Sequence, residues 1–522
     1  MTCRKSSLYG KGTLVCLVYL LLTFLPVIYL ALSGENADQE IWNSRRAGLM
    51  VNSFLIAFFT AAVCLVIAVF ASMRIHAAFR KRSLLRWYFL ILAPVPPYIY
   101  ALSYMNLLRS LGKVFPEILR VRMTGLFPCI AVEILAYLPF TCAAALIALD
   151  QVNEKEWSAA FIFESADHVF FQVVFPAQIP WLLATGAIIF VLSVMDYSIP
   201  SLFQVNVYSM EIFSAYSASG QSVHSLYLSL PLILSASVMI ILSLLPLKNT
   251  AQTMKENSGI RPAYSPVLKA VGGTAVALTL LQILLPLLSF VPFLLKPGAD
   301  SVSSVSELWN SCLAGFFSVL LLIIPSAAMA LLLTADDLPC RPVILMIAVL
   351  PLCIPGVLTG IGVLKLFSAT PLYVLRTGVF LPAAGLAVRY LPFAMLIQYG
   401  CYLRMDHSRI RAARLLQSST CSAFLRVQLP LMTPGLIISG IVVFLLTLGD
   451  VGTSLVLATA GREPMSVKIY NYLHYGSSEK VTFFCLIQML LCIALMGCVY
   501  LVMARPRIKR SFSQDKSSFP EE

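Results

Sequence analysis

The chain has 522 residues, of which 59% are apolar and only 12% are charged. An ordinary soluble domain is about a quarter charged, so this composition excludes a soluble enzyme, and the same figures exclude a disordered chain. The formal net charge of +13 comes from short basic runs between apolar stretches. That pattern indicates membrane topology and not nucleic-acid binding.

Twelve apolar stretches are long enough to cross a bilayer as helices, which takes about 20 residues each. In chain order they are 13–32, 51–72, 87–108, 125–148, 180–200, 225–246, 268–295, 309–333, 343–366, 377–402, 434–459 and 482–504. The first could be a signal peptide, but no small-residue cleavage site follows it, so we expect a retained helix. The sequence therefore predicts an all-α membrane protein with twelve transmembrane helices.

The distribution of basic residues predicts the orientation of these helices. With both termini in the cytoplasm, lysine and arginine are about twice as frequent in the inner segments as in the outer ones. The basic loop 109–122 departs from this bias, and an amphipathic surface helix is the one explanation that the sequence offers. We expect a multi-pass protein of the bacterial plasma (inner) membrane, in contact with lipid.

The chain repeats itself at an offset near 254. Seven positions match without a gap: Pro176, Pro180, Leu182, Gly186, Phe190, Leu192 and Asp196 with Pro430, Pro434, Leu436, Gly440, Phe444, Leu446 and Asp450. Upstream, residues 137–140 match 390–393, and a paired-proline pattern also recurs. We therefore expect two homologous six-helix halves with a pathway between them. The expected divisions are a first half over 1–246, a cytoplasmic linker over 247–267, a second half over 268–505 and a basic, polar cytoplasmic tail over 506–522.

The loops between the fourth and fifth spans of each half carry the most informative motif. The second loop contains Arg411, Ala412, Ala413, Leu416 and Gln417, followed by Pro430. The first contains the weaker counterpart Trp157, Ser158, Ala159, Ala160 and Phe163, followed by Pro176. Small residues at 412 and 413 with apolar residues at 415 and 416 predict one face of a short helix that docks on a partner.

This loop resembles the E-A-A-x-x-x-G…L-P loop of ABC-importer permeases. The sequence departs from that pattern where Arg411 and Trp157 replace the glutamate and where Gln417 and Phe163 replace the glycine. The resemblance implies a transport subunit that is not itself an enzyme and binds no cofactor. It also implies two partners: a cytoplasmic ABC ATPase dimer, which hydrolyses the ATP, and an extracytoplasmic substrate-binding protein.

The substrate depends on a weaker resemblance. Residues 448–450 and 466–470 are similar to ferric-iron permeases with two fused halves, so ferric iron is the first expectation. Thiamine, a phosphonate, sulfate or a polyamine remain alternatives within the same superfamily. A secondary transporter with a six-plus-six repeat is the alternative from another class.

Four charged residues are candidates for the pathway or a gate. Asp196 and Asp450 occupy equivalent places in the repeat, near the predicted outer ends of their spans. They are either a pair of carboxylates at the outer mouth or ordinary helix ends exposed to water. Glu133 and Arg389 lie deeper, in the fourth span of each half, where a lone charge is costly. They could pair across the centre as a structural ion pair or as a gate.

Two kinds of site are not indicated by the sequence. The 13 cysteines and five histidines have no metal-ligand spacing, so no metal site is expected. Gly10-Lys11-Gly12-Thr13 lacks the upstream glycine of a phosphate loop and precedes a membrane span, so we expect the energy for transport to come from a partner or from an ion gradient.

Overall fold

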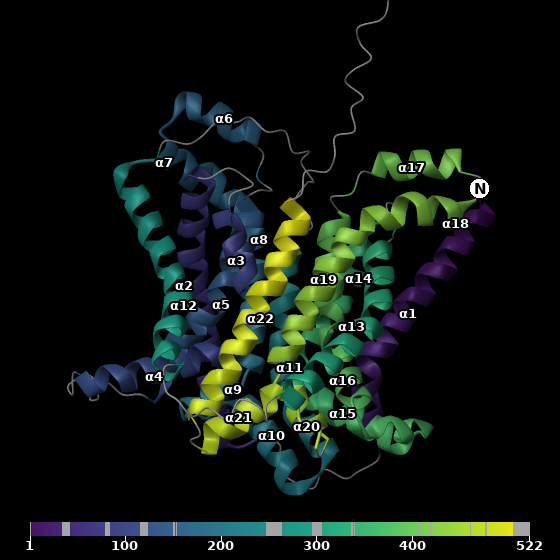
Figure 1. The fold of residues 1–522 in the computed structure, drawn as a ribbon. Helices are drawn as coiled ribbons and strands as arrows, with labels where there is room; N and C mark the ends of the chain where they lie inside the picture. Colours follow the sequence, from purple (N-terminus) through teal and green to yellow (C-terminus); the bar gives the residue numbers. More distant parts are fainter. Residues whose placement is uncertain are drawn as a thin grey trace, which may run out of the picture.

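The computed structural model describes residues 2–33, 42–78, 84–114, 124–149, 152, 154–246, 264–294, 305–335, 338, 340–403, 405, 407–417, 419–459, 461–475 and 478–504. Every regular element in these residues is a helix, as the sequence predicts (Figure 1). Most of the expected linker, the whole of the expected tail and residues 115–123 lie outside the described residues.

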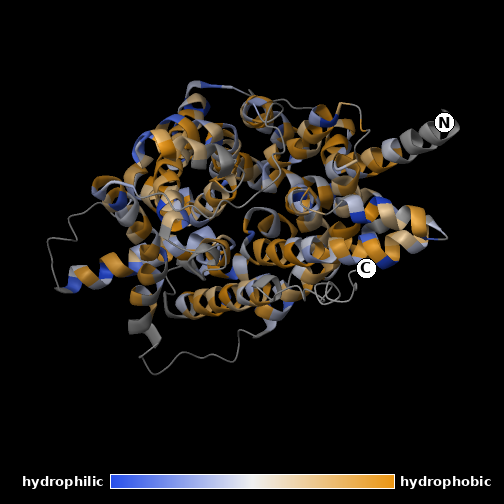
Figure 2. Cartoon of the chain, turned by 90° about the horizontal axis from the view of Figure 1, so that it is seen from above, coloured by the Kyte–Doolittle hydropathy of each residue, from blue (hydrophilic) through white to orange (hydrophobic). Residues whose placement is uncertain are grey.

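Ten of the described helices are long and apolar enough to cross a membrane, and they coincide with ten of the twelve predicted stretches. They are α1 Thr2–Leu32, α2 Ser44–Ala78, α5 Leu126–Leu149, α8 Phe175–Met195, α11 Ser222–Leu244, α12 Pro266–Leu294, α13 Val305–Leu333, α16 Phe380–Tyr402, α19 Leu429–Gly449 and α22 Ser478–Ala504. Their outward surfaces are apolar, since Phe58, Leu234 and Ile324 are 60%, 63% and 74% exposed. Figure 2, which looks along the bundle, shows hydrophobic residues on most of these helices.

The two remaining stretches, 87–108 and 343–366, are not the continuous helices that the sequence predicts. The first is divided into α3 Leu84–Leu92 and α4 Pro97–Val114. The second is divided into α14 Arg341–Val349, η5 Leu350–Cys353 and α15 Gly356–Ala369, and its two parts meet at 88°. Prolines stand at both breaks, at 94, 96 and 97 and at 351 and 355. Because proline lacks an N–H and clashes with the preceding turn, a helix does not continue straight through such a run.

Short elements connect the long helices. On the way to and from the spans they are α6 Glu154–Phe163, α7 Ala166–Val169, η2 Phe170–Val174, α9 Ser198–Leu202, α10 Tyr208–Ser219, η6 Pro371–Arg376, α17 His407–Leu416, α18 Thr420–Ala423, η7 Phe424–Gln428, α20 Gly452–Leu457 and α21 Met465–Tyr475. The succession from α5 to α11 recurs from α16 to α22, and the two π-helical turns η2 and η7 are separated by the repeat offset of 254.

The first long helix of each repeat lies against the other repeat. Helix α1 contacts α13, α15 and α16, whereas α12 contacts α2, α4 and α5. A tyrosine hydroxyl secures each exchange: Tyr19 donates to the carbonyl of Ala348 at 3.0 Å, and Tyr88 donates to the carbonyl of Thr279 at 2.6 Å. The two repeats are thereby interleaved.

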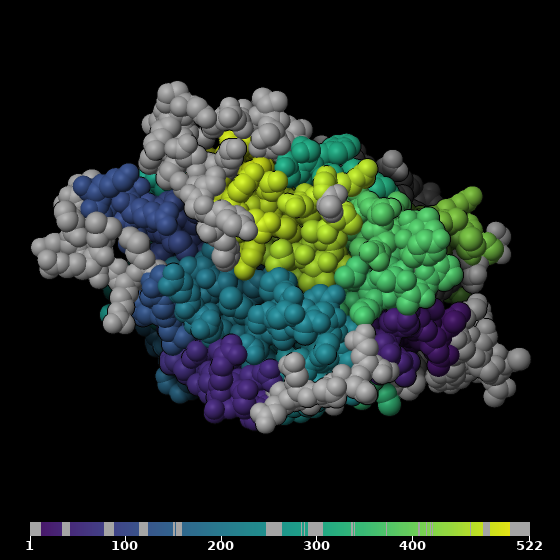
Figure 3. Space-filling view, turned by 90° about the horizontal axis from the view of Figure 1, so that it is seen from below, coloured from purple at the N-terminus to yellow at the C-terminus, as the bar shows by residue number. Residues whose placement is uncertain are grey.

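The short elements divide between two faces of the bundle. In Figure 1, α6 and α17 lie at the top, across the direction of the spans, and α1 begins and α22 ends on this same face. Helices α4, α10, α15 and α21 lie at the opposite end. Seen from below in Figure 3, the teal segments around α10 and the yellow segments around α21 share the middle of that opposite face.

Candidate functional site

The two surface helices α6 and α17 occupy the loops that the sequence analysis selected. The sequence of α17 shows why it does not enter the membrane: three arginines interrupt its ten residues, His407–Leu416. Both helices end in a pair of large apolar side chains, Ile162 with Phe163 and Leu415 with Leu416. They therefore present apolar groups on a polar surface.

The exposed apolar groups form the same pattern on both helices. Ile162 and Phe163 are 78% and 82% exposed, and Leu415 and Leu416 are 86% and 85% exposed. Ala159 and Ala412 are exposed as well, three residues before each pair. Residues at i, i+3 and i+4 share one face of a helix, so each surface helix carries a small–large–large apolar face, with an offset of 253 between the two. A patch of this kind on a polar rim is typical of an interaction surface.

The inner side of α17 differs from the prediction for Ala412 and Ala413, which were expected on one common face. Ala413 is 9% exposed and shares the inward face with Ile410, which is 6% exposed. Ala412 and Arg411 are exposed, and Gln417 follows the helix end. The equivalent helix, α6, exposes Ala159 and half buries Ala160; the side chains of Trp157 and Ser158 lie outside the described part of the chain.

Each surface helix leads directly into a membrane-spanning helix. Helix α6 is followed by α7, η2 and α8, and α17 is followed by α18, η7 and α19. The residue before each of the two repeated prolines, Pro176 and Pro430, makes a π-helical hydrogen bond to the residue five positions earlier. Phe175 N–H donates to Phe170 O, and Leu429 N–H donates to Phe424 O. Pro176 and Pro430, both exposed, cannot donate and crowd the previous turn, which accounts for the π-helical turns at these two places.

Near the end of α8 that is farther from α6, a fully buried acid joins three helices. Glu133 on α5 is 0% exposed. Its Oε2 accepts hydrogen bonds from Thr60 Oγ1 of α2 at 3.3 Å and from Ser193 Oγ of α8. Its Oε1 has no described partner. Glu133 therefore connects the span before α6 with the span after it.

Near the end of α19 that is farther from α17, an ion pair joins the equivalent two spans. Arg389 Nε of α16 lies 3.0 Å from Asp450 Oδ2, and Tyr390 donates its hydroxyl to the same oxygen at 3.0 Å. Asp450 Oδ1 accepts the backbone N–H groups of Thr453 and Ser454 at 2.8 and 3.1 Å, which caps α20. Asp450 is thus saturated by partners from its own repeat.

Asp196 has a different environment from Asp450, although both stand where a span ends in extended backbone. Its Oδ1 accepts from the Ser198 hydroxyl at 2.6 Å and the Ser198 N–H at 2.8 Å, and its Oδ2 is buried without a described partner. Burial raises the pKa of the Asp196 carboxyl, although the bonds from Ser198 and the charge of Arg389 act in the opposite direction.

These contacts revise the expectation for the four charged residues. The pair considered between Glu133 and Arg389 does not form, because Arg389 pairs with Asp450 and Glu133 bonds to hydroxyls. Asp450 is 3% exposed, so it is neither a free carboxylate at a mouth nor a helix end in water. The spans predicted over 180–200 and 434–459 end earlier in the structure. Their helices end at Met195 and Gly449, and Asp196 and Asp450 follow in extended backbone.

A second set of ion pairs, which the sequence analysis did not find, lies at the opposite face. Glu211 of α10 pairs with Arg45 at 2.9 Å and with Arg46 at 3.3 Å at the start of α2. In the other repeat the polarity is reversed, since Lys468 of α21 pairs with Glu307 of α13 at 3.7 Å. Glu211 and Lys468 are 257 residues apart, close to the repeat offset, so the repeat could have indicated that they occupy equivalent places. Their opposite charges hide this equivalence in the sequence.

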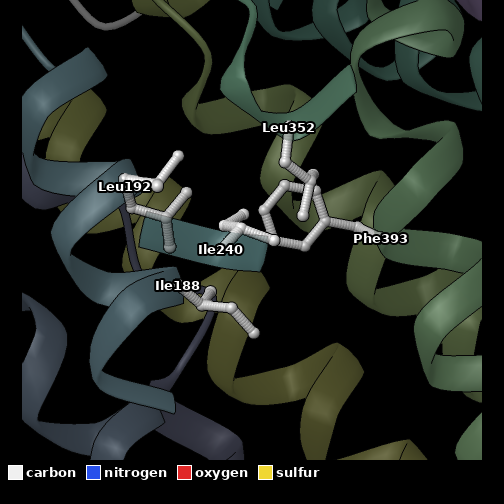
Figure 4. Close-up of a pocket in the computed structure, with 6 residues that line it drawn as sticks. Ile188, Leu192, Ile240, Leu352 and Phe393 are labelled. Atoms are coloured by element: carbon white, nitrogen blue, oxygen red, sulfur yellow. The ribbon is translucent and has the colours of Figure 1, made fainter. Parts of the chain in front are cut away.

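The two repeats meet at a dry apolar seam. It is lined by side chains that point toward one another from α8, α11, η5 and α16 (Figure 4), namely Ile188, Val191, Leu192, Ile240, Leu352 and Phe393. The seam leaves no space for a water molecule. The described side chains therefore pack closely where the two repeats meet.

Comparison with protein-family models gives no matching family. Over 191 aligned residues, which cover 33% of this chain, the sequence is 24% identical to the protein named "Putative 2-aminoethylphosphonate transport system permease protein PhnU" of Salmonella typhi. The identity is also 24% over 191 residues with the protein of the same name from Salmonella typhimurium. The chain spans 66% and 67% of the length of these two relatives. This distant homology supports an ABC permease and a membrane transport subunit.

Proposed function

We propose that the chain is the membrane-spanning permease subunit of an ATP-driven ABC importer. In this proposal it crosses the bacterial plasma membrane twelve times as two homologous six-helix halves, with both termini in the cytoplasm. A binding protein delivers the substrate from outside, and a separate cytoplasmic ATPase dimer supplies the energy. The observation that best supports this proposal is the matched apolar face of α6 and α17, whose four large side chains are 78–86% exposed.

The matched faces support this proposal because a dimeric ATPase offers two equivalent docking grooves. Fully burying a leucine or phenylalanine stabilises a contact by about 1.5–3 kcal/mol, so two large side chains on each helix are enough to anchor it. Arg411 of α17 stands where the resembled family has a glutamate, which favours an acidic rim on the ATPase groove. The direct connections from α6 to α8 and from α17 to α19 would carry movement of the ATPases to the apolar seam.

The substrate is proposed on two separate grounds. Ferric iron follows from the resemblance of residues 448–450 and 466–470 to the iron permeases, and a phosphonate follows from the name of the Salmonella relatives. Uptake of radioactive iron and of 2-aminoethylphosphonate, compared in cells with and without the chain, separates the two. The proposed substrate is the one whose uptake disappears on deletion and returns with the wild-type gene.

Co-purification tests the coupling itself. A tagged full-length chain purified from its native membranes should bring an ABC ATPase with it, and the complex should hydrolyse ATP. Leu416→Asp should weaken the complex roughly tenfold, since about 1.4 kcal/mol corresponds to a factor of ten. Tyr373→Asp is the matched control, because Tyr373 is 64% exposed on η6 near the opposite face. Equal recovery of the ATPase with all three proteins would reject the proposal.

A further inference from the structure

Glu133 is buried in a way that an ionised carboxylate does not tolerate. It is 0% exposed in the middle of α5, and its two described hydrogen bonds come from neutral hydroxyls, Thr60 and Ser193. A charge inside a membrane protein needs an opposite charge, backbone donors or water. The described contacts of Glu133 supply neither an opposite charge nor a backbone donor.

Among the described residues, the titratable groups that interact with Glu133 are acids, and Arg389 acts on two of them, Asp196 and Tyr137. Asp196 interacts with it from the end of α8, and Cys64 interacts with it from α2. Cys129 and Tyr137 lie one turn before and one turn after it on α5. An acid that is surrounded only by acids gains nothing from losing its proton.

In the other repeat, a buried acid is paired with a base. There, Asp450 has Arg389 within 3.0 Å. At the local offset of 253, which aligns Tyr137 with Tyr390, the position equivalent to Arg389 is Ala136. The first repeat thus contains a deeply buried acid and lacks the base that neutralises an acid in the second.

We propose that Glu133 is a proton-binding site: in the arrangement described here its carboxyl group is neutral and holds a proton on Oε1. The geometry selects Oε1, because Oε2 already accepts both hydroxyl bonds and Oε1 has no described partner. The ligand is a proton, which needs no cavity.

The site also has a defined way to release the proton, and this part rests on the proposed function. Ser193 lies on α8, which continues from α6 through α7 and η2. If an ATPase moves α6, α8 carries Ser193 away from Glu133 on α5. Water that then reaches the uncovered carboxyl group stabilises the carboxylate, and the proton passes to that water. Transport would therefore slow at low pH, where Glu133 stays neutral.

Infrared spectroscopy of the purified full-length chain tests the site without any ATPase. At neutral pH the wild-type protein should show the carbonyl stretch of a protonated carboxylic acid, and selective ¹³C-glutamate labelling should shift this band. Glu133→Gln should abolish it. Glu211→Gln should leave it, because Glu211 is 7% exposed but is paired with Arg45 and Arg46. A wild-type spectrum without a label-sensitive band, or a band that survives Glu133→Gln, would overturn the proposal.

Thermal unfolding in detergent provides a second, independent readout. If the folded chain holds a proton that the unfolded chain releases, raising the pH above the ordinary range of glutamate, about 4.3, destabilises the wild type. Glutamine keeps the hydroxyl bonds and has no proton to release. The melting temperature of Glu133→Gln should therefore exceed that of the wild type by an amount that grows between roughly pH 5 and 8. A difference that does not change with pH contradicts the proton site. If the melting difference changes with pH as expected but no ATPase co-purifies with the chain, the proton site is retained and coupling to an ATPase is rejected.

Discussion

At the scale of single residues, the ion pair between Arg389 and Asp450 is a buried polar connection between two of the described spans. The side chain of Asp450 is 1% exposed and that of Arg389 is 24% exposed. Gly356, at the start of α15, is required for this pair, because a Cβ at that position would lie 1.1 Å from Arg389 Nη1. The pair thus joins the end of α19 to α16 and lies against the broken third span.

The two equivalent aspartates should respond differently to the same substitution. Asp450→Asn leaves Arg389 without its partner, and breaking a buried pair from one side costs roughly 3–5 kcal/mol. Asp196→Asn retains an oxygen for the Ser198 bonds, so the expected loss is about 1 kcal/mol. Melting temperatures of the two full-length variants in detergent should therefore fall clearly for Asp450→Asn and slightly for Asp196→Asn. Equal losses would mean that the ion pair is not what stabilises this region.

At the scale of elements, the repeat predicted more than the hydropathy did. The spacing of prolines and small residues gave both surface helices and their offset, because these elements follow from local sequence. The same hydropathy predicted uninterrupted third spans, which the prolines at 94–97 and 351–355 break. The partner of Arg389 could not be read from the sequence, since three-dimensional packing alone decides between Glu133 and Asp450.

The two neighbouring alanines of α17 should separate docking from folding. Ala412 is exposed, so Ala412→Arg should preserve the melting temperature and abolish ATPase recovery. Ala413 is 9% exposed beside Ile410, so Ala413→Arg should lower the melting temperature as well, by the cost of an arginine that does not fit a close-packed site. Both variants are assayed by unfolding and by co-purification. A stable Ala412→Arg protein that still recovers the ATPase would show that this face is not the docking face.

At the scale of the whole molecule, interleaving explains how one bundle could act on a single pathway. Because α1 lies on the second repeat and α12 lies on the first, neither repeat can move far without the other. The apolar seam between α8, α11, η5 and α16 is closely packed, and its lining helix α8 is the one that α6 leads into. Sequence reasoning found the two repeats but not their exchange, because apolar helix surfaces carry little information about which neighbour they contact.

The central claim is that α6 and α17 bind the same kind of ATPase subunit, and site-specific photo-crosslinking tests it most directly. A photoreactive phenylalanine analogue is placed at Phe163, at Leu416 or, as the control, at Tyr373 in the full-length chain within native membranes. Phe163 and Leu416 are 82% and 85% exposed, and Tyr373 is 64% exposed, so all three probes can reach a partner. Crosslinks to an ABC ATPase are expected from 163 and from 416, and none from 373. Absence of the ATPase adduct at both 163 and 416, or equal yields at all three positions, would contradict it.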